Sequence, residues 1–175
     1  MLTIVIGGAG SGKSAFAEKH VCMLPGRKIY LATMLPRDGE SRERVRKHRA
    51  QRVHLGFETL ERGLDLAGAE IPADANVLLE DLSNLLANEM YETAGGGMDS
   101  VHRGLEHLIT SCENLTVVTN EVFSGGADYD PESLRYMRAL ADLNRWLAAR
   151  ADLAVEIVCG LPNVLKGCAS SALVV

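Results

Sequence analysis

The hydrophobic positions of this chain fall into short apolar runs that alternate with longer amphipathic stretches. Apolar runs rich in Val, Ile and Leu predict strands buried on both faces, because such strands lack the alternation of a half-exposed sheet. We expect strands at residues 2–6, 28–33, 76–82, 115–120 and 154–158. The stretches between them predict helices that begin at residue 14, cover 84–93 and 99–111, and run from 131 to about 150.

The succession of strand, helix and strand favours parallel pairing with right-handed crossovers, so the predicted fold class is α/β. Residues 40–52 contain neither Gly nor Pro and predict a further helix, and residues 58–67 predict a short one. After a turn at Gly160 and Pro162, residues 164–166 predict a short antiparallel strand at the edge of the sheet. Because no linker or repeat interrupts the chain, we expect residues 1–175 to form a single domain with a doubly wound, mostly parallel sheet.

Composition and charge exclude several classes of protein. The net charge of −5, the pI of about 5.5 and the aromatic content of 5% argue against a general nucleic-acid binder. The chain opens without the features of a signal peptide, and no apolar run has membrane-spanning length. The four cysteines form no C-x-x-C pair, which disfavours a zinc site or a disulfide framework. We therefore expect a soluble cytoplasmic protein.

The strongest chemical signal is a glycine-rich segment between the first predicted strand and the first predicted helix. It fits the phosphate-binding P-loop pattern G-x-x-x-x-G-K-[ST], and its residues are Gly7, Gly8, Ala9, Gly10, Ser11, Gly12, Lys13 and Ser14. Glycines let backbone N–H groups point at phosphate oxygens, and the helix N-terminus adds the positive end of its dipole. We expect Lys13 to reach the terminal phosphates and Ser14 to bind Mg²⁺. The segment predicts a site for a nucleoside triphosphate, ATP or GTP.

Two carboxylates follow the apolar run of the third predicted strand, at Glu80 and Asp81. In P-loop proteins an acidic residue at a strand end faces the Mg²⁺ beside the loop. Either residue fits that role by its position.

Residues 40–52 are the most charged part of the chain, and His48 lies there among Arg44, Arg49 and Arg52 at helical spacing. The simpler interpretation is a solvated surface helix. The alternative is a basic helix facing an anion, because neighbouring cations favour the neutral imidazole that can act as a nucleophile. His102 and His107 are spaced poorly for sharing a metal on one helical face, so we expect structural roles for them.

Taken together, the order and spacing of several segments resemble the bifunctional adenosylcobinamide kinase/adenosylcobinamide-phosphate guanylyltransferase family of cobalamin biosynthesis. The matching segments are 7–14, 30–33, 44–49, 59–61, 77–80, 119–122, 143–144 and 164–167. The resemblance implies a P-loop NTPase with a RecA-like sheet, an enzyme that assembles as a trimer, and adenosylcobinamide and GTP as substrates.

The resemblance also implies roles for individual residues. His48 would accept GMP from GTP, while Lys13 and the P-loop would serve phosphoryl transfer. Nucleotide contacts are implied at Ala32, Thr33, Met34, Arg49, Ala50, Gln51, Arg52, Glu61 and Glu80.

The chain departs from the family pattern over residues 123–130, where Gly and an apolar-Pro stretch are usual. We therefore expect acceptor binding to be altered while nucleotide binding is kept. Two alternatives stay open: a P-loop kinase that acts on another alcohol without guanylyl transfer, and a non-catalytic, nucleotide-gated binding protein of the same fold.

Overall fold

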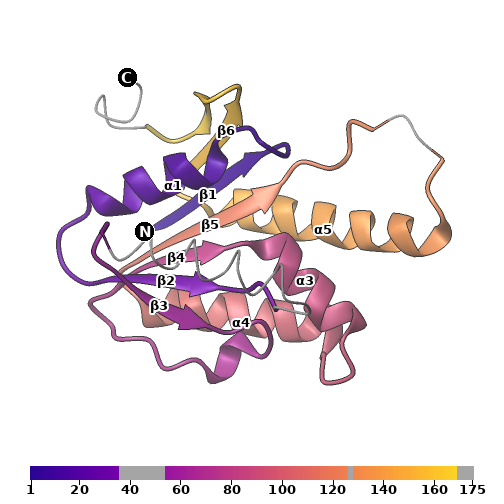
Figure 1. Cartoon of the computed structure of the whole chain (residues 1–175), viewed down its shortest axis with the longest axis horizontal. Coiled ribbons are helices and arrows are strands. Elements are labelled where there is room, and N and C mark those ends of the chain that lie inside the picture. The colour runs from indigo at the N-terminus through magenta and orange to yellow at the C-terminus, as the bar shows by residue number, and fades with distance from the viewer. Residues whose placement is uncertain (36–53, 126–127, 169–175) are drawn as a thin grey trace.

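The computed structural model describes residues 1–35, 54–125 and 128–168, and its centre is a seven-stranded sheet (Figure 1). The strands lie in the order β3-β2-β4-β5-β1-β6-β7. All neighbours pair in parallel except β7, which runs antiparallel to β6 at one edge. The strands are β1 (Leu2–Gly7), β2 (Lys28–Ala32), β3 (Phe57–Glu61), β4 (Asn76–Glu80), β5 (Asn114–Asn120), β6 (Leu153–Val158) and β7 (Leu161–Lys166).

Helices cover both faces of the sheet, as the apolar runs of the central strands require (Figure 1). On one face α3 (Leu82–Tyr91), α4 (Gly97–Ser111) and α5 (Pro131–Arg150) pack against alternate strand residues in one hydrophobic cluster. On the other face α1 (Lys13–Cys22) buries Phe16, Ala17 and Val21 in a second cluster. The mostly parallel α/β sheet with an antiparallel C-terminal edge is therefore confirmed.

The longest helix, α5, begins and ends where the sequence predicts. Asp130 is its N-cap, and the Asp130 carboxylate accepts hydrogen bonds from the backbone N–H groups of Glu132 and Ser133, both at 2.9 Å. Pro131 occupies the first helical position, where a missing N–H costs nothing. Leu140, Leu143 and Leu147 then face the sheet at helical spacing and are fully buried.

The short helix expected over residues 58–67 is wrong. Residues 57–61 instead form β3, the edge strand beside β2, and a single 3₁₀ turn, η1 (Leu66–Gly68), follows. Glu and Leu favour helices locally, but pairing with β2 satisfies the backbone and buries Phe57 against Tyr30, with ring centroids 5.7 Å apart. The helix expected over 40–52 lies outside the described residues.

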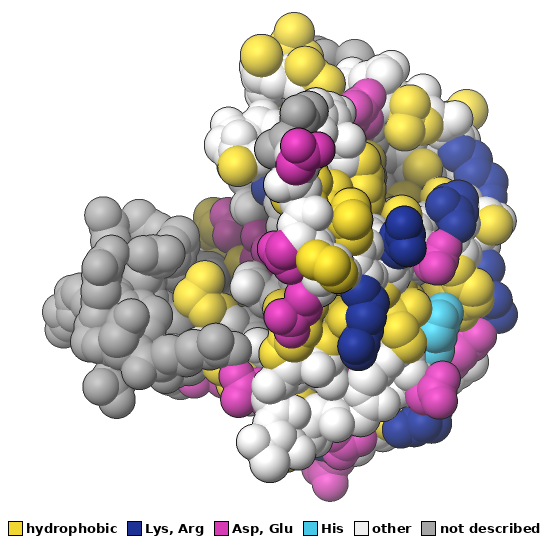
Figure 2. Space-filling view, turned by 90° about the vertical axis from the view of Figure 1, so that its right-hand side faces the viewer, with side chains coloured by type: hydrophobic (Ala, Val, Ile, Leu, Met, Phe, Trp, Pro, Cys, Tyr) yellow, Lys and Arg dark blue, Asp and Glu magenta, His cyan; other side chains and the backbone are white. Residues whose placement is uncertain are grey.

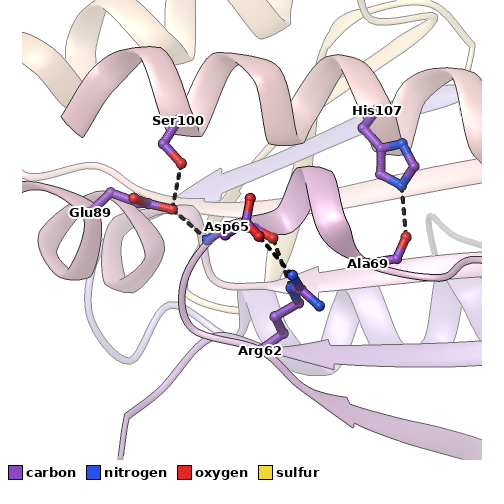
Figure 3. Close-up of polar contacts among 6 residues, drawn as sticks. All are labelled: Arg62, Asp65, Ala69, Glu89, Ser100 and His107. Carbon is purple, nitrogen blue, oxygen red and sulfur yellow. Dashed lines mark hydrogen bonds and ion pairs between the residues drawn. The ribbon is translucent and has the colours of Figure 1, made fainter. Parts of the chain in front are cut away.

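A buried carboxylate fixes the segment that follows β3 (Figure 3). Glu89 of α3 accepts hydrogen bonds from Asp65 N at 2.7 Å and Ser100 Oγ at 2.9 Å through Oε1, and from Gly96 N at 2.7 Å through Oε2. Three donors compensate for its removal from water. Glu89 thereby ties η1 and the start of α4 to α3.

The two histidines of α4 have structural partners. His107 Nε2 lies 2.8 Å from Ala69 O (Figure 3), and its Nδ1 lies 3.2 Å from Ser111 Oγ. His102 packs edge-on against Trp146 with centroids 4.9 Å apart.

Within the described ranges, no helix combines the length and apolarity needed to cross a membrane.

Candidate active site

The P-loop curls between β1 and α1 at the carboxyl edge of the sheet. Gly10 and Gly12 have φ angles of 70° and 93°, left-handed backbone that glycine adopts without strain. Gly7 is closely packed, because a Cβ there would lie 2.5 Å from Ser11 Oγ and 2.8 Å from Ile157 O. The glycines of the sequence pattern are therefore required by the backbone path of the loop.

The turn between β6 and β7 supports the loop from a distant part of the chain. Gly160 N donates a hydrogen bond to Ser11 O at 2.8 Å, and the Gly160 Cα would lie 3.4 Å from a Cβ at Gly12. Gly160 itself has a φ of 79°. The sequence showed Gly160 only as a turn residue, because its contact with the P-loop depends on β6 lying beside β1.

The first turn of α1 carries the two polar side chains that the motif assigns to phosphate and metal. Lys13 is buried, and its Nζ donates to Gly8 O at 3.2 Å, across the mouth of the loop. Ser14 Oγ donates to Glu80 Oε1 at 2.6 Å. The structure thus brings Glu80, at the end of β4, to the P-loop although β5 lies between β4 and β1.

One carboxylate oxygen of Glu80 has no partner in the structure described. Its Oε2 is closed to solvent and has no hydrogen-bond partner among the described residues. Burial raises the pKa of Glu80 from 4.5 to about 7, and the negative charge of Asp81 adds to this, while the hydrogen bond from Ser14 opposes it. A positive charge beside Oε2 would restore the ionised form.

These oxygens fit Mg²⁺, which prefers oxygen ligands and is usually bound through one or two carboxylates together with substrate phosphates. In the described parts of the chain no group of three His, Cys, Asp or Glu side chains could hold a metal alone. Ser14 and Glu80 are the residues here that could contribute oxygen ligands to such an ion beside a nucleotide.

Three of the predicted contact positions lie in one row across the sheet. Ala32 pairs with Glu61 of β3 on one side and with Glu80 of β4 on the other. All three are the last residues of parallel strands, the edge at which ligands bind in open α/β sheets. Met34 follows two residues after this row and is half-buried.

Thr33 and Asp81 fasten the ends of β2 and β4 together. Thr33 is fully buried, and its Oγ1 lies 2.8 Å from Asp81 O and accepts a hydrogen bond from Asp81 N at 2.9 Å. The Asp81 carboxylate accepts from Asn84 N at 2.7 Å and Ser83 Oγ at 2.6 Å, which makes it the N-cap of α3. Glu80, and not Asp81, is therefore the acid that contacts Ser14.

Two asparagines also organise this edge; the sequence placed Asn120 at the ligand edge without giving it a role, and it did not single out Asn88. Asn88 Nδ2 donates to Thr33 O at 2.8 Å and to Gly63 O at 3.0 Å. Asn120, at the end of β5, is paired in register with Gly7, and its amide donates to Ser83 Oγ. A polar residue at a strand end was the available signal for Asn120, whereas Asn88 had none.

The remaining predicted positions are His48 and its neighbours Arg49, Ala50, Gln51 and Arg52. They lie outside the described residues.

Comparison with protein families gives one match that spans most of the chain. The family model described as cobinamide kinase / cobinamide phosphate guanyltransferase matches residues 3–165.

Two bacterial relatives match over nearly their whole length. The bifunctional adenosylcobalamin biosynthesis protein CobP of Pseudomonas aeruginosa is 31% identical over 171 residues, covering 95% of this chain and 98% of that protein. The bifunctional adenosylcobalamin biosynthesis protein CobU of Salmonella typhimurium is 31% identical over 185 residues, covering 95% and 100%. Among solved structures, the P4 protein of bacteriophage phi6 in complex with ADP aligns with a TM-score of 0.42 and 19% identity, over 94% of this chain and 52% of that one.

Proposed function

The chain belongs to the cobinamide kinase / cobinamide phosphate guanyltransferase family and is a transferase, and we propose that it performs both reactions on adenosylcobinamide. It would first phosphorylate the acceptor alcohol and then attach GMP to the new phosphate, giving adenosylcobinamide-GDP. The observation that supports this most directly is the hydrogen bond of Ser14 to Glu80, a half-buried residue beside Lys13 and the P-loop whose Oε2 is closed to solvent and has no partner among the described residues.

In the first transfer, the alcohol oxygen forms a bond to the γ-phosphorus of a nucleoside triphosphate, and the bond to the β-bridging oxygen breaks. Lys13 and the loop N–H groups stabilise the negative charge on the phosphoryl oxygens, and burial strengthens this effect because little water screens it. Ser14 and Glu80 would hold Mg²⁺, which neutralises charge on the β- and γ-phosphates. Glu80 would be ionised beside that ion, and its carboxylate could then accept the hydrogen bond of Ser14 and hold the cation together.

In the second transfer, neutral His48 attacks the α-phosphorus of GTP, and pyrophosphate leaves. The resulting phosphoramidate passes GMP to the phosphate monoester, and His48 is regenerated. A covalent intermediate divides a displacement between two anions into two easier steps. This assignment is supported by the family resemblance around residues 44–49.

The experiment is a labelling assay with GTP carrying ³²P at the α-phosphate, with Mg²⁺, followed by denaturing electrophoresis. We expect an acid-labile, alkali-stable label on the wild-type protein and none on His48→Asn, because an amide cannot form a phosphoramidate. His54→Asn is the matched control and should label normally. Labelling should fall as the pH drops and His48 becomes protonated, because imidazolium has no lone pair for attack.

A parallel assay with γ-labelled nucleotide and adenosylcobinamide separates the alternatives. His48→Asn should keep its kinase activity, since phosphoryl transfer uses Lys13 and the P-loop. Phosphoryl transfer without labelling of the wild type would favour a kinase alone, and turnover of another alcohol in place of adenosylcobinamide would refute the acceptor. Nucleotide binding with neither transfer would favour a non-catalytic binding protein.

We also propose that the protein works in the cytoplasm, as a homotrimer and as a single domain. The edge strand β7 supports self-association, because Leu161 and Leu165 are 71% and 59% exposed and the outer edge of β7 pairs with no other strand among the described residues. Light scattering coupled to gel filtration measures the assembly, and a monomeric mass at micromolar concentration would refute it.

A further inference from the structure

A cavity of about 530 Å³ lies beside the nucleotide site, between α3 and the first two turns of α5. This volume is within the range of small-molecule sites. We call it the tyrosine cavity because three tyrosines line it, and its lining residues used below are Ala87, Tyr91, Val122, Tyr129, Glu132 and Tyr136. Figure 2 views the molecule from the right-hand side of Figure 1, toward the N-terminal end of α5, and hydrophobic side chains lie on that face among both acidic and basic ones.

Two connections place the tyrosine cavity next to the phosphate edge. Val122 lies two residues beyond Asn120, which is paired with Gly7 at the start of the P-loop. Tyr136 Oη donates to Ser83 O at 3.0 Å, in the first turn of α3. Ala87 is six residues beyond Asp81 on the same helix, about 9 Å along its axis at 1.5 Å per residue. A ligand in the cavity could therefore extend a flexible arm to the P-loop.

The walls of the cavity suit an extended ring system without negative charge. Tyr91 and Tyr136 have ring centroids 6.5 Å apart, and the exposed fractions of Tyr91 and Tyr129 are 43% and 37%, so stacking faces are available. Burial raises the pKa of Tyr136 to about 12, so its hydroxyl stays a neutral donor.

Charge excludes phosphate from the tyrosine cavity. The described residues that line it include neither Lys nor Arg, whereas Asp130 and Glu132 are acidic. The Asp130 carboxylate accepts hydrogen bonds from the start of α5, which leaves Glu132 as the acidic group at the rim. A triphosphate would be repelled here, and a neutral or cationic ligand would not.

We propose that the tyrosine cavity binds the corrin macrocycle of the acceptor, with its alcohol arm directed to the P-loop. The inference rests on the proposed function, which supplies a corrinoid as the acceptor class. A corrin ring offers a broad apolar face for the tyrosines, and its peripheral amides can bond to the phenol hydroxyls. Tyr129 lies within the segment in which this chain departs from its family, residues 123–130, and Val122 directly precedes it, so this wall of the site would be particular to this protein.

The test fills the cavity without touching the P-loop. Ala87→Phe places a ring in the cavity, and Tyr129→Ala removes a wall at a position where folding is not at stake, because Tyr129 lies outside the helices and strands. Ala149→Phe, an equal change at an exposed position near the far end of α5, is the control. Adenosylcobinamide binding is followed by equilibrium dialysis and corrinoid absorbance, and Mg²⁺-GTP binding by calorimetry.

We expect Ala87→Phe and Tyr129→Ala to weaken adenosylcobinamide binding at least tenfold and to raise its KM, with the Kd for GTP within twofold of wild type. Ala149→Phe should match wild type for both ligands. Unchanged corrinoid binding in both cavity variants would overturn the proposal and leave the proposed function standing. A parallel loss of GTP binding would show that the cavity holds the nucleotide base, which also overturns it. A wild-type protein that binds no corrinoid would refute the proposed function itself.

Discussion

Replacing Glu80 with Gln should stabilise the nucleotide-free protein at neutral and alkaline pH. The glutamine Oε1 can still accept the hydrogen bond that Ser14 Oγ donates to Glu80 Oε1. What the substitution removes is the ionisation of a carboxyl group whose Oε2 is closed to solvent. Both the amide and the protonated acid carry a hydrogen at that end, so the two proteins should have similar stability when Glu80 is neutral.

The magnitude follows from the pKa. Glu80 ionises near 4.5 in the unfolded chain and near 7 in the folded protein. Between these values the unfolded state binds fewer protons, so the free energy of unfolding of the wild type decreases as the pH rises. A shift from 4.5 to about 7, at 1.36 kcal/mol per pKa unit, corresponds to about 3 kcal/mol. Glu80→Gln cannot lose a proton there, so its advantage should grow from near zero at pH 4.5 to about 3 kcal/mol at pH 8.

Urea unfolding of both proteins from pH 5 to pH 8, without Mg²⁺ or nucleotide, measures this difference. Glu113→Gln removes the same charge at an exposed position and should shift stability by no more than about 0.5 kcal/mol. A stability difference between wild type and Glu80→Gln that does not vary with pH would refute the reasoning.

Adding Mg²⁺-GTP to the same samples should reduce the stability advantage of Glu80→Gln. At one hundred times its Kd a ligand stabilises the folded state by about 2.7 kcal/mol. Wild type should gain this amount, whereas Glu80→Gln lacks the carboxylate for the cation and should gain much less. Equal stabilisation of the two proteins would exclude Glu80 as a metal ligand.

Two further predictions concern single residues. Lys13→Ala should lower phosphoryl transfer at least about 100-fold in a steady-state kinase assay, because a buried cation at the transferring phosphate is lost. Lys28→Ala, at the opposite end of β2 from the site, is the control and should stay near wild type. Near-normal turnover of Lys13→Ala would contradict the assignment. Gly104→Ala should lower the free energy of unfolding, measured in urea, by up to about 2 kcal/mol, because the new Cβ would lie 2.7 Å from Leu66 Cβ. The higher helix propensity of Ala offsets only part of that crowding. Unchanged or higher stability would contradict this prediction.

The sequence predicted the central strands because residues such as Val77, Leu78 and Leu79 form a short continuous apolar run, and such a run is typical of a strand that is buried on both faces of a sheet. It missed β3 because Glu58, Leu60 and Glu61 have helical propensities that only pairing with β2 overrides. The intrinsic propensities of a short segment predict its secondary structure poorly when the strand that pairs with its backbone is distant in the sequence.

The candidate site likewise has parts that local sequence patterns predict and parts that depend on tertiary structure. The P-loop is a local pattern, and its glycines, Lys13 and Ser14 lie as the pattern requires. The choice between Glu80 and Asp81 could not be made from the residues alone, because it depends on which side chain faces α1 and which caps α3. The contact of Gly160 with Ser11 depends on the order of strands, which no local pattern encodes.

The position of β1 in the sheet also sets when this protein can first bind nucleotide during its synthesis. β1 pairs with β5 and β6, with Leu2 opposite Leu115 and Thr3 opposite Leu153. At about 5–20 residues per second a ribosome needs roughly 6 to 20 s after Leu2 to reach the first of these partners, and longer to complete the turn that supports the P-loop. The phosphate-binding motif leaves the ribosome well before the strands that hold it in place. Nucleotide can therefore bind the completed P-loop only after β5 and β6 have also been made.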